Sequence, residues 1–389
     1  FGSRGRGLPR GALPRGRPAM GAAKSLEKGY GRLQRFVIRP ARQIYQDGDL
    51  GPVAFTFGGV EFCRVDFVVK NARGMTLRCS HWMPAAEGPA SCLAPGQKRS
   101  GPQDARPPCV VYCHGNAGCR LEALAILPCA LAMGCSMVAF DFSGSGISEG
   151  EHVSLGWYEQ HDLAAVVSHL RRSGRIGNLV LWGRSMGAVT ALLYAGSEPG
   201  AAGEVDGMVL DSPFSDFGVV AAERAEHAQS RGQLLPGSLL LVPLVLAMLS
   251  LSIHAEAGFD PRDLDPTSAA RSCRVPALFL IAEEDQFIPP SHGRRLFAAY
   301  GGQKRLLAFP GGHNSQRPVG VYEFAEGFLA PALQAAGGST LRRPRGVAVH
   351  NGRRPPWEAP PAERSARLGT LFGWPGCAGD EGGAAARAP

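Results

Sequence analysis

Three residues that together can perform acyl transfer occur in the chain in a fixed order. Ser185, Asp285 and His313 each lie a few residues after a predicted strand. A serine hydroxyl becomes a nucleophile when a histidine takes its proton and a carboxylate orients that histidine. The carboxyl ends of parallel strands meet at one edge of a sheet, so the three side chains can converge there. The sequence therefore predicts a catalytic serine, with Asp285 as acid and His313 as base.

The serine lies in the pentapeptide GRSMG, where Gly183, Ser185 and Gly187 form G-x-S-x-G. This pattern is typical of a tight turn from a strand into a helix that exposes the serine hydroxyl, and 179–182 before it is an apolar run. The two glycines remove side chains that would collide in the turn. An ordinary strand-to-helix turn fits the pentapeptide as well, and the downstream acid and histidine favour the catalytic interpretation.

Other carboxylates could supply the acid. Glu283 and Glu284 are neighbours of Asp285, and Asp211 ends the preceding predicted strand. Carboxylates at strand ends also cap turns, so Asp285 is the preferred choice and Asp211 an alternative. His313 differs from the other histidines because it follows the last predicted strand in a glycine-bearing loop.

The turn 114–118, HGNAG, follows another predicted strand and is placed to help stabilise an oxyanion. We expect the backbone amides of Met186 and Asn116 to be the two donors, and His114 to be a structural residue beneath the loop. The glycine-rich stretch 141–146 lacks the lysine and spacing of a phosphate-binding loop. No histidine or carboxylate cluster has metal-ligand spacing. We therefore predict no metal and no cofactor.

Strands and helices alternate along the chain, which predicts a mostly parallel central sheet with helices on both faces. A hairpin over 60–83 comes first and is followed by a Pro- and Gly-rich surface insertion over 84–108. The later predicted elements are strands 109–113, 136–140, 179–182, 208–210, 277–281 and 304–309, and helices 121–133, 156–171 and 188–195. The alternation stops over about 213–274, which predicts an inserted helical cap.

The centre of this cap, residues 234–253, contains twenty consecutive residues without a charge. That length could span a bilayer. Pro236, Gly237 and Pro243 interrupt the segment, and it lies between strands of one sheet. We therefore expect an apolar lid over a substrate cleft, with membrane contact as the alternative.

Both ends of the chain are basic and carry the formal net charge of +8. Residues 1–35 are predicted to be a disordered leader, 36–335 the folded domain and 336–389 a disordered tail. The basic residues are not interleaved with aromatic ones, which argues against nucleic acid as a partner. The ten cysteines include no C-x-x-C pair and are typical of free thiols in the cytoplasm. Residues 20–25 match the myristoylation pattern, so Gly21 could carry an acyl anchor if Met20 initiates the chain.

The segments YCHGNAGC, FDFSGSGIS, GRSMGAVT, LDSPFSD and FPGGHNSQRP resemble the α/β-hydrolase superfamily. Within it they are most similar to the serine aminopeptidase-like branch, which includes depalmitoylating hydrolases, and to plant and protist members of unassigned substrate. The resemblance extends from about Phe36 to Leu333. It implies an α/β-hydrolase fold, and it implies the same nucleophile, acid, base and oxyanion donors.

The sequence thus predicts an esterase or thioesterase that acts on a small or lipid-like molecule with an apolar acyl group. One alternative is an aminopeptidase, for which Glu223 or Glu226 in the cap would hold the substrate's amine. The other is a catalytically silent protein that uses the same fold for binding. The oligomeric state does not follow from the sequence.

Overall fold

A nine-stranded sheet runs through the computed structural model, which describes residues 30–89, 106–197, 203–234, 237–334 and 355–358. The order in space is β1-β2-β3-β5-β4-β6-β7-β8-β9. Along this order, the neighbouring strands β1, β2, β3 and β5 pair antiparallel. The remaining pairs, from β5–β4 to β8–β9, are parallel. The strands are β1 Ala54–Phe57, β2 Val60–Lys70, β3 Thr76–Pro84, β4 Cys109–Cys113, β5 Ser136–Phe140, β6 Leu179–Arg184, β7 Gly207–Asp211, β8 Ala277–Ala282 and β9 Lys304–Phe309.

The central strands are apolar because both faces of the sheet are covered. In β4 every residue is buried, and successive side chains point to opposite faces. Val111 belongs to the core cluster on one face, and Val110 and Tyr112 belong to the cluster on the other. The strands therefore read as continuous hydrophobic runs and not as alternating ones.

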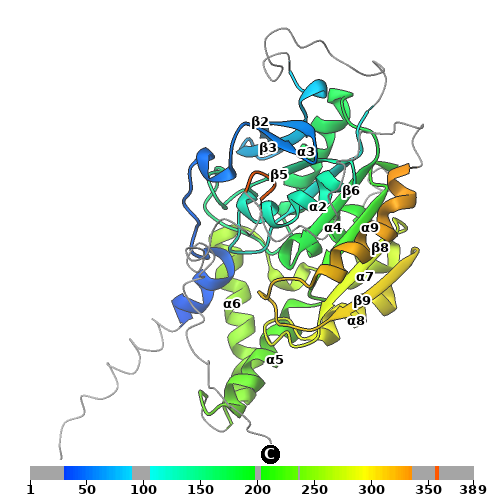
Figure 1. Ribbon diagram of the computed structural model, residues 1–389. Helices are drawn as coiled ribbons and strands as arrows, with labels where there is room; N and C mark the ends of the chain where they lie inside the picture. The colour runs from blue at the N-terminus through cyan, green and yellow to red at the C-terminus, as the bar shows by residue number, and fades with distance from the viewer. Residues whose placement is uncertain (1–29, 90–105, 198–202, 235–236, 335–354, 359–389) are drawn as a thin grey trace, which may run out of the picture.

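Helices lie on both faces of the sheet, as predicted (Figure 1). On one face are α3 Glu159–Ser173, α4 Met186–Ser197, α7 Pro266–Ser272 and α8 Pro290–Ala299, and on the other are α2 Leu127–Ala132 and α9 Val319–Gln334. The helix expected over 121–133 is instead a 3-10 helix, η4 Arg120–Ala125, followed by α2. Pro128 explains the break because it has no N–H to continue the helical hydrogen bonds.

The insertion between β7 and β8 contains α5 Phe217–Ser230, η6 Ser238–Leu241, α6 Val242–Ala257, η7 Pro261–Asp263 and then α7. The last of these helices belongs to the layer over the sheet, since a side chain at Gly196 of α4 would collide with the backbone of Ala269 in α7. Figure 1 shows α5 and α6 extending beyond the end of the sheet. The projecting cap is therefore smaller than the predicted 213–274.

The ends of the chain differ in part from the prediction. Residues 30–35, assigned to a disordered leader, belong to a helix over 30–38 that packs beside α6 (Figure 1). Two further 3-10 helices, η1 Asp47–Leu50 and η2 Ala85–Glu87, flank the first strands. In the predicted tail, Trp357 packs edge-on against Phe55 of β1, with 5.3 Å between ring centroids. The rest of the leader and tail lies outside the described residues, as does most of the predicted surface insertion over 84–108.

Candidate active site

A strained turn places Ser185 between β6 and α4. Its φ is +52°, a left-handed conformation that a residue with a side chain rarely adopts. The Ser185 N–H donates to the carbonyl of Asp211 at 2.8 Å, which fixes the turn against β7. A side chain at Gly183 would collide with the Gly187 carbonyl, and one at Gly187 would collide with the Cys113 carbonyl. Both glycines are therefore needed for steric reasons, and the strain at Ser185 marks a candidate functional position.

The structure brings Ser185, His313 and Asp285 into one hydrogen-bonded chain. The His313 Nε2 lies 3.0 Å from the Ser185 Oγ, and the His313 Nδ1 lies 2.6 Å from the Asp285 Oδ2. With a neutral imidazole, Nδ1–H donates to the carboxylate and Nε2 accepts from the hydroxyl. Only 9% of the His313 side chain and 1% of the Asp285 side chain is exposed. The arrangement can take a proton from the serine in a largely water-free setting.

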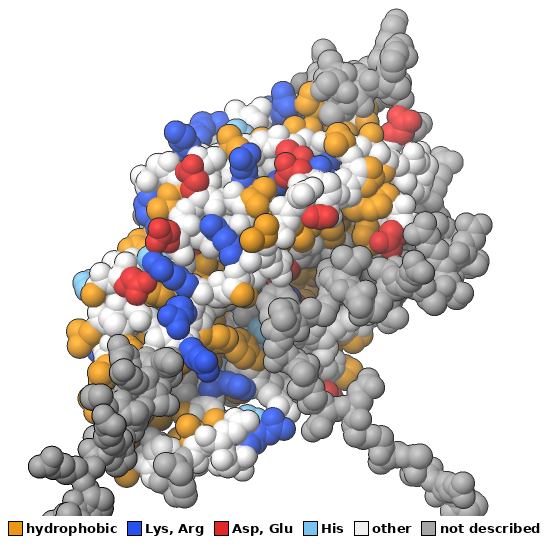
Figure 2. All heavy atoms as spheres, turned by 90° about the vertical axis from the view of Figure 1, so that its left-hand side faces the viewer, with side chains coloured by type: hydrophobic (Ala, Val, Ile, Leu, Met, Phe, Trp, Pro, Cys, Tyr) orange, Lys and Arg blue, Asp and Glu red, His pale blue; other side chains and the backbone are white. Residues whose placement is uncertain are grey.

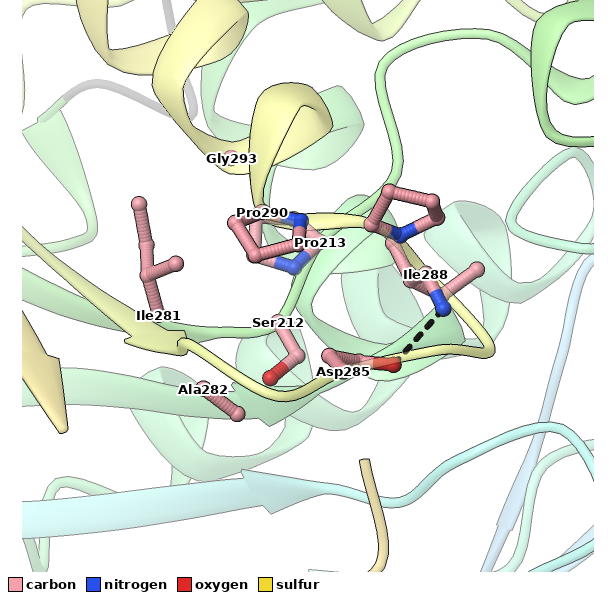
Figure 3. Close-up of a pocket in the computed structure, with 9 residues that line it drawn as sticks. Ser212, Pro213, Ile281, Ala282, Asp285, Ile288, Pro290 and Gly293 are labelled. Atoms are coloured by element: carbon pink, nitrogen blue, oxygen red, sulfur yellow. Dashed lines mark hydrogen bonds between the residues drawn. The ribbon is translucent and has the colours of Figure 1, made fainter. Parts of the chain in front are cut away.

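The loop after β8 holds the Asp285 carboxylate in place. Its Oδ1 accepts hydrogen bonds from the backbone N–H groups of Phe287 at 2.9 Å and Ile288 at 2.8 Å. Figure 3 shows the second of these bonds as a dashed line. This leaves Oδ2 for the histidine. The alternative acids Glu283 and Glu284 are both exposed, and neither is hydrogen-bonded to His313.

A small cavity of about 10 Å³ lies behind Asp285 and is drawn in Figure 3. It is lined by Ser212, Pro213, Ile281, Ala282, Asp285, Ile288, Pro289, Pro290 and Gly293. This is room for about one water molecule. It cannot hold an acyl chain, so this cavity is not the substrate site.

Asp211, the alternative acid, is committed to another partner. Its carboxylate receives two hydrogen bonds from Arg317, from Nε at 2.8 Å and Nη2 at 2.9 Å. Burial acts to raise the pKa of Asp211, but Arg317, Arg184 and the Ser212 hydroxyl together outweigh it and hold that pKa below its usual value. Arg317 also donates to the carbonyl of His313 at 3.1 Å. Asp211 therefore acts on the site through Arg317 and is not hydrogen-bonded to the histidine.

The loop 114–118 packs against the start of α4. A side chain at Gly187 would lie 2.7 Å from the His114 carbonyl, so the two backbones are in direct contact. Met186 is the first residue of α4, and its N–H has no partner within the helix. The side-chain oxygen of Asn116 is buried without a hydrogen-bond partner among the described residues. The free N–H of Met186 fits the first predicted oxyanion donor. The buried oxygen of Asn116 is an acceptor and does not bear on its backbone N–H, so the donor roles of both Met186 and Asn116 stay proposals.

His114 lies beneath this loop, as expected for a structural residue. It is fully buried, its Nδ1 is 2.7 Å from the Gly115 carbonyl, and its Nε2 accepts from the Phe142 N–H at 3.1 Å. Both ring nitrogens are thus occupied by the backbone.

Two charged residues that no sequence pattern marked as functional connect the loops of the site. Arg184, next to the serine, donates to the His313 carbonyl at 3.1 Å and to the Asn314 side chain at 2.7 Å. Glu122 accepts from the Gly115 N–H at 3.1 Å and lies 3.8 Å from Arg184. Together they link the histidine loop to the loop 114–118. The position of Arg184 beside the serine in GRSMG is the one sequence feature that could have indicated its role.

Aromatic residues flank the histidine. The ring centroid of Phe287 is 5.1 Å from that of His313, and Phe36 of the N-terminal helix contacts Phe287 edge-on at 6.1 Å. Phe287 is 36% exposed and Phe36 57% exposed. The site is therefore bordered by apolar side chains from two distant parts of the sequence.

The described residues contain no cluster of three or more histidine, cysteine or carboxylate side chains that could hold a metal ion. The glycine-rich turn 141–146 curls around the side chain of its first residue, Asp141. The Asp141 carboxylate accepts hydrogen bonds from the backbone N–H of Ile147, just after the turn, at 2.9 Å and from that of Arg120 at 2.7 Å. A side chain at Gly146 would collide with that carboxylate. The turn is therefore built around an internal anion.

Comparisons with known proteins agree with this architecture. The esterase Pf2001 of Pyrococcus furiosus superposes with a TM-score of 0.53 at 17% identity, covering 76% of this chain and 98% of the esterase. Residues 108–239 match the family model described as "alpha/beta hydrolase fold". The chain has the α/β-hydrolase fold. In this fold Ser185 directly follows β6, Asp285 lies in the loop after β8, and His313 lies in the loop after β9.

Relatives by sequence match only part of this chain. An uncharacterized protein of Bacillus subtilis, YqkD, is 31% identical over 212 residues, which are 54% of this chain and 65% of YqkD. Lysophosphatidylserine lipase ABHD12 of Macaca fascicularis is 24% identical over 204 residues, 49% of this chain and 44% of the lipase. The chain thus spans less than two thirds of either relative. The plant and protist branch stays a prediction.

Proposed function

We propose that this α/β-hydrolase-fold protein is a serine hydrolase that cleaves carboxylic esters or thioesters of apolar acyl groups. The observation that carries the proposal is the hydrogen-bonded chain from Ser185 through His313 to Asp285. It is the arrangement that general-base activation of a serine requires.

In the first half of the reaction, the Nε2 of His313 takes the proton of the Ser185 hydroxyl as its Oγ bonds to the substrate's carbonyl carbon. The carbonyl oxygen becomes an oxyanion and accepts hydrogen bonds from the N–H groups of Met186 and Asn116. Asp285 stabilises the imidazolium that forms. The imidazolium then gives its proton to the leaving alcohol or thiol, and an acyl-enzyme remains.

In the second half, water attacks the acyl carbon while His313 takes one of its protons. Collapse of the second tetrahedral intermediate releases the carboxylic acid, and the proton returns to the Ser185 oxygen. The low exposure of His313 and Asp285 strengthens each charge interaction in these steps.

Apolar side chains at the site support an apolar acyl group as substrate. Phe287 and Phe36 present partly exposed rings beside His313, and Ile288 follows in the acid loop. The names of one structural neighbour, an esterase, and one sequence relative, a lysophosphatidylserine lipase, agree with ester chemistry.

The peptidase alternative needs a free carboxylate for the substrate's amine. Glu223 is instead engaged: its Oε2 lies 2.9 Å from the His292 Nε2, and its Oε1 lies 3.4 Å from Arg295. Glu226 is exposed on the same helix. The engagement of Glu223 counts against it as the amine-binding carboxylate, and the aminopeptidase alternative then rests on Glu226.

We also propose a cytoplasmic location, from the buried free cysteines of the described residues. Membrane attachment through an acylated Gly21 is part of this proposal if Met20 initiates the chain; both residues lie outside the described ranges. Mass spectrometry of the native protein tests it: an acylated Gly21 peptide is expected, and an intact peptide across Met20 would contradict it.

Hydrolysis of a panel of acyl esters and acyl thioesters of increasing chain length tests the function itself. The full chain is expected to hydrolyse them, with a preference for apolar acyl groups, and Ser185→Ala is expected to lose this activity. An unchanged rate in Ser185→Ala would overturn the assignment, and a folded wild-type chain without activity on any member would favour a silent binding protein.

A further inference from the structure

The cap presents a long apolar helix surface that the domain leaves uncovered. Residues Ser238–Ala257 form η6 and α6, and an 18-residue window of this segment has a mean hydropathy of 2.1, yet only 17% of that window is buried. A helix that is apolar all round is normally enclosed by protein or lipid. Packing against the main core explains the buried residues of this segment and leaves its outward residues unexplained.

The exposed side chains form one face, which we call the apolar ridge: Leu240, Leu241, Leu244, Val245, Met248 and Leu251. They are between 36% and 86% exposed. At 3.6 residues per turn they fall within one side of the helix, about 16 Å long. The opposite side carries Leu249 and Ile253, which are buried in the main core. The helix is thus anchored in the domain by one face and offers the other to the surroundings.

The N-terminal helix over 30–38 lies along the edge of this ridge and adds positive charge. The hydroxyls of Tyr30 and Ser252 are 2.6 Å apart, and the Gln34 side chain donates to Glu256 at 2.7 Å. Arg32 and Arg35 on this helix are exposed, and neither forms an ion pair among the described residues. Figure 2 shows basic and apolar side chains together on this side of the molecule.

The same helix leads from the ridge to the catalytic centre. Its Phe36 contacts Phe287, which in turn contacts His313. Leu33, one turn before Phe36, is also 39% exposed. An apolar path therefore connects the uncovered surface to the residues that would perform the reaction.

We propose that the apolar ridge and the N-terminal helix dock the protein on the surface of an anionic phospholipid bilayer, and that the acyl substrates are presented to Ser185 from that bilayer. The substrate half of this inference rests on the proposed function; the docking half does not. Leucine and methionine side chains enter the boundary between headgroups and acyl chains, while Arg32 and Arg35 remain at the anionic headgroups.

Charge and anchoring favour this occupant over two others. A transmembrane helix would have to withdraw Leu249 and Ile253 from the core, where they are 1% and 0% exposed. In a symmetric contact between two copies, each ridge would bring its own Arg32 and Arg35 towards those of the partner, and like charges oppose that pairing.

Vesicle flotation of the full-length chain tests the docking half. Wild type is expected to float with mixed phosphatidylcholine and phosphatidylserine vesicles and to be released by high salt. Leu240→Ser with Leu251→Ser is expected to weaken binding by about tenfold per leucine. The matched control is Val53→Ser with Val68→Ser. Val53 lies just before β1 and Val68 lies on β2, so both side chains are exposed but away from the cap. Arg32→Glu with Arg35→Glu is expected to lose the preference for anionic vesicles.

Each other outcome contradicts the docking half. Wild type that stays with the soluble fraction, or a leucine variant that floats as well as wild type, would overturn it. A wild type that is dimeric without vesicles, and a leucine variant that is monomeric, would assign the ridge to a second copy. Resistance of bound protein to alkaline extraction would assign it to a span.

Activity measurements separate the substrate half from the proposed function. Hydrolysis of a soluble short-chain ester is expected to be the same in wild type and the leucine variant, because the ridge does not contact the catalytic residues. Hydrolysis of a long-chain acyl ester held in the same vesicles is expected to fall at least tenfold in the variant. An equal rate on vesicles would overturn the substrate half. Absence of activity on both substrates in wild type would overturn the proposed function and leave the flotation result standing.

Discussion

Replacing Asp285 by asparagine is expected to stop the reaction through a change of histidine tautomer. The Oδ1 of Asp285 accepts two backbone hydrogen bonds, from Phe287 and Ile288. Only the oxygen of an asparagine amide can accept these bonds, so its NH₂ group must face the Nδ1 of His313. The Nδ1 then becomes an acceptor, and the ring proton moves to Nε2.

An imidazole with its proton on Nε2 cannot take a proton from Ser185, which lies 3.0 Å from that nitrogen. In serine proteases the corresponding change lowers kcat by about 10⁴, or ~5.4 kcal/mol of transition-state stabilisation. We expect a similar loss in Asp285→Asn. Its thermal stability is expected to stay close to wild type, since both backbone hydrogen bonds are kept.

The matched control is Asp211→Asn, which removes the other strand-end carboxylate. This change leaves the buried Arg317 cation without its counter-charge and is expected to cost about 3–5 kcal/mol of folding stability. At a temperature where the variant is folded, its kcat is expected to fall far less than that of Asp285→Asn. Ester hydrolysis and thermal unfolding of both variants decide the matter. The reasoning fails if Asp285→Asn keeps kcat within tenfold, or if Asp211→Asn shows the larger loss of kcat at unchanged stability.

Two further predictions follow from close contacts. Gly187→Ala is expected to push α4 away from the end of β4 at Cys113 and to lower kcat by about 10²-fold, as misplacements near 1 Å do. Gly48→Ala is the control, because Gly48 is exposed and has open space around it. Wild-type activity in Gly187→Ala would contradict the contact. The second prediction concerns His292, whose pKa is lowered by burial despite the neighbouring Glu223. As pH falls through about 6.5, this histidine takes up a proton in the unfolded chain but not in the folded one. The free energy of unfolding is therefore expected to decline as the pH falls through that value. Thermal unfolding from pH 8 to 5 should show a shallower slope for His292→Gln, and an equal slope would assign the effect elsewhere.

The arrangement of the sheet could be predicted because its signals are local and strong. Continuous apolar runs such as 109–113 have few alternatives to a buried parallel strand. Once the strands are placed, their carboxyl ends bring Ser185, Asp285 and His313 to one edge, so the order of residues was enough to place the site. The roles of these residues remain proposals.

Long-range polar contacts could not be predicted in the same way. Nothing in the sequence indicates that Arg317 pairs with Asp211, 106 positions away, or that Glu223 is taken by His292. Such pairs depend on how loops and helices meet after folding. The pairing of Asp211 removed an alternative acid, and that of Glu223 weakened the peptidase interpretation.

The cap was placed but its orientation was not. An apolar segment over 234–253 indicates burial somewhere, and a lid was the reasonable expectation. The segment has no polar side to show which residues face the domain. Only the structure distinguishes the buried Leu249 from the exposed Leu251. The helix over 30–38 was missed because its basic residues resemble those of the leader.

Labelling with a fluorophosphonate tests the central claim most directly, because the probe forms a covalent bond with a serine only where a base activates it and an oxyanion site receives it. The account predicts a single adduct on the full-length folded chain, located at Ser185 by peptide mass spectrometry and absent in Ser185→Ala. An unlabelled wild-type chain, or an adduct that persists at the same rate in Ser185→Ala, would contradict it.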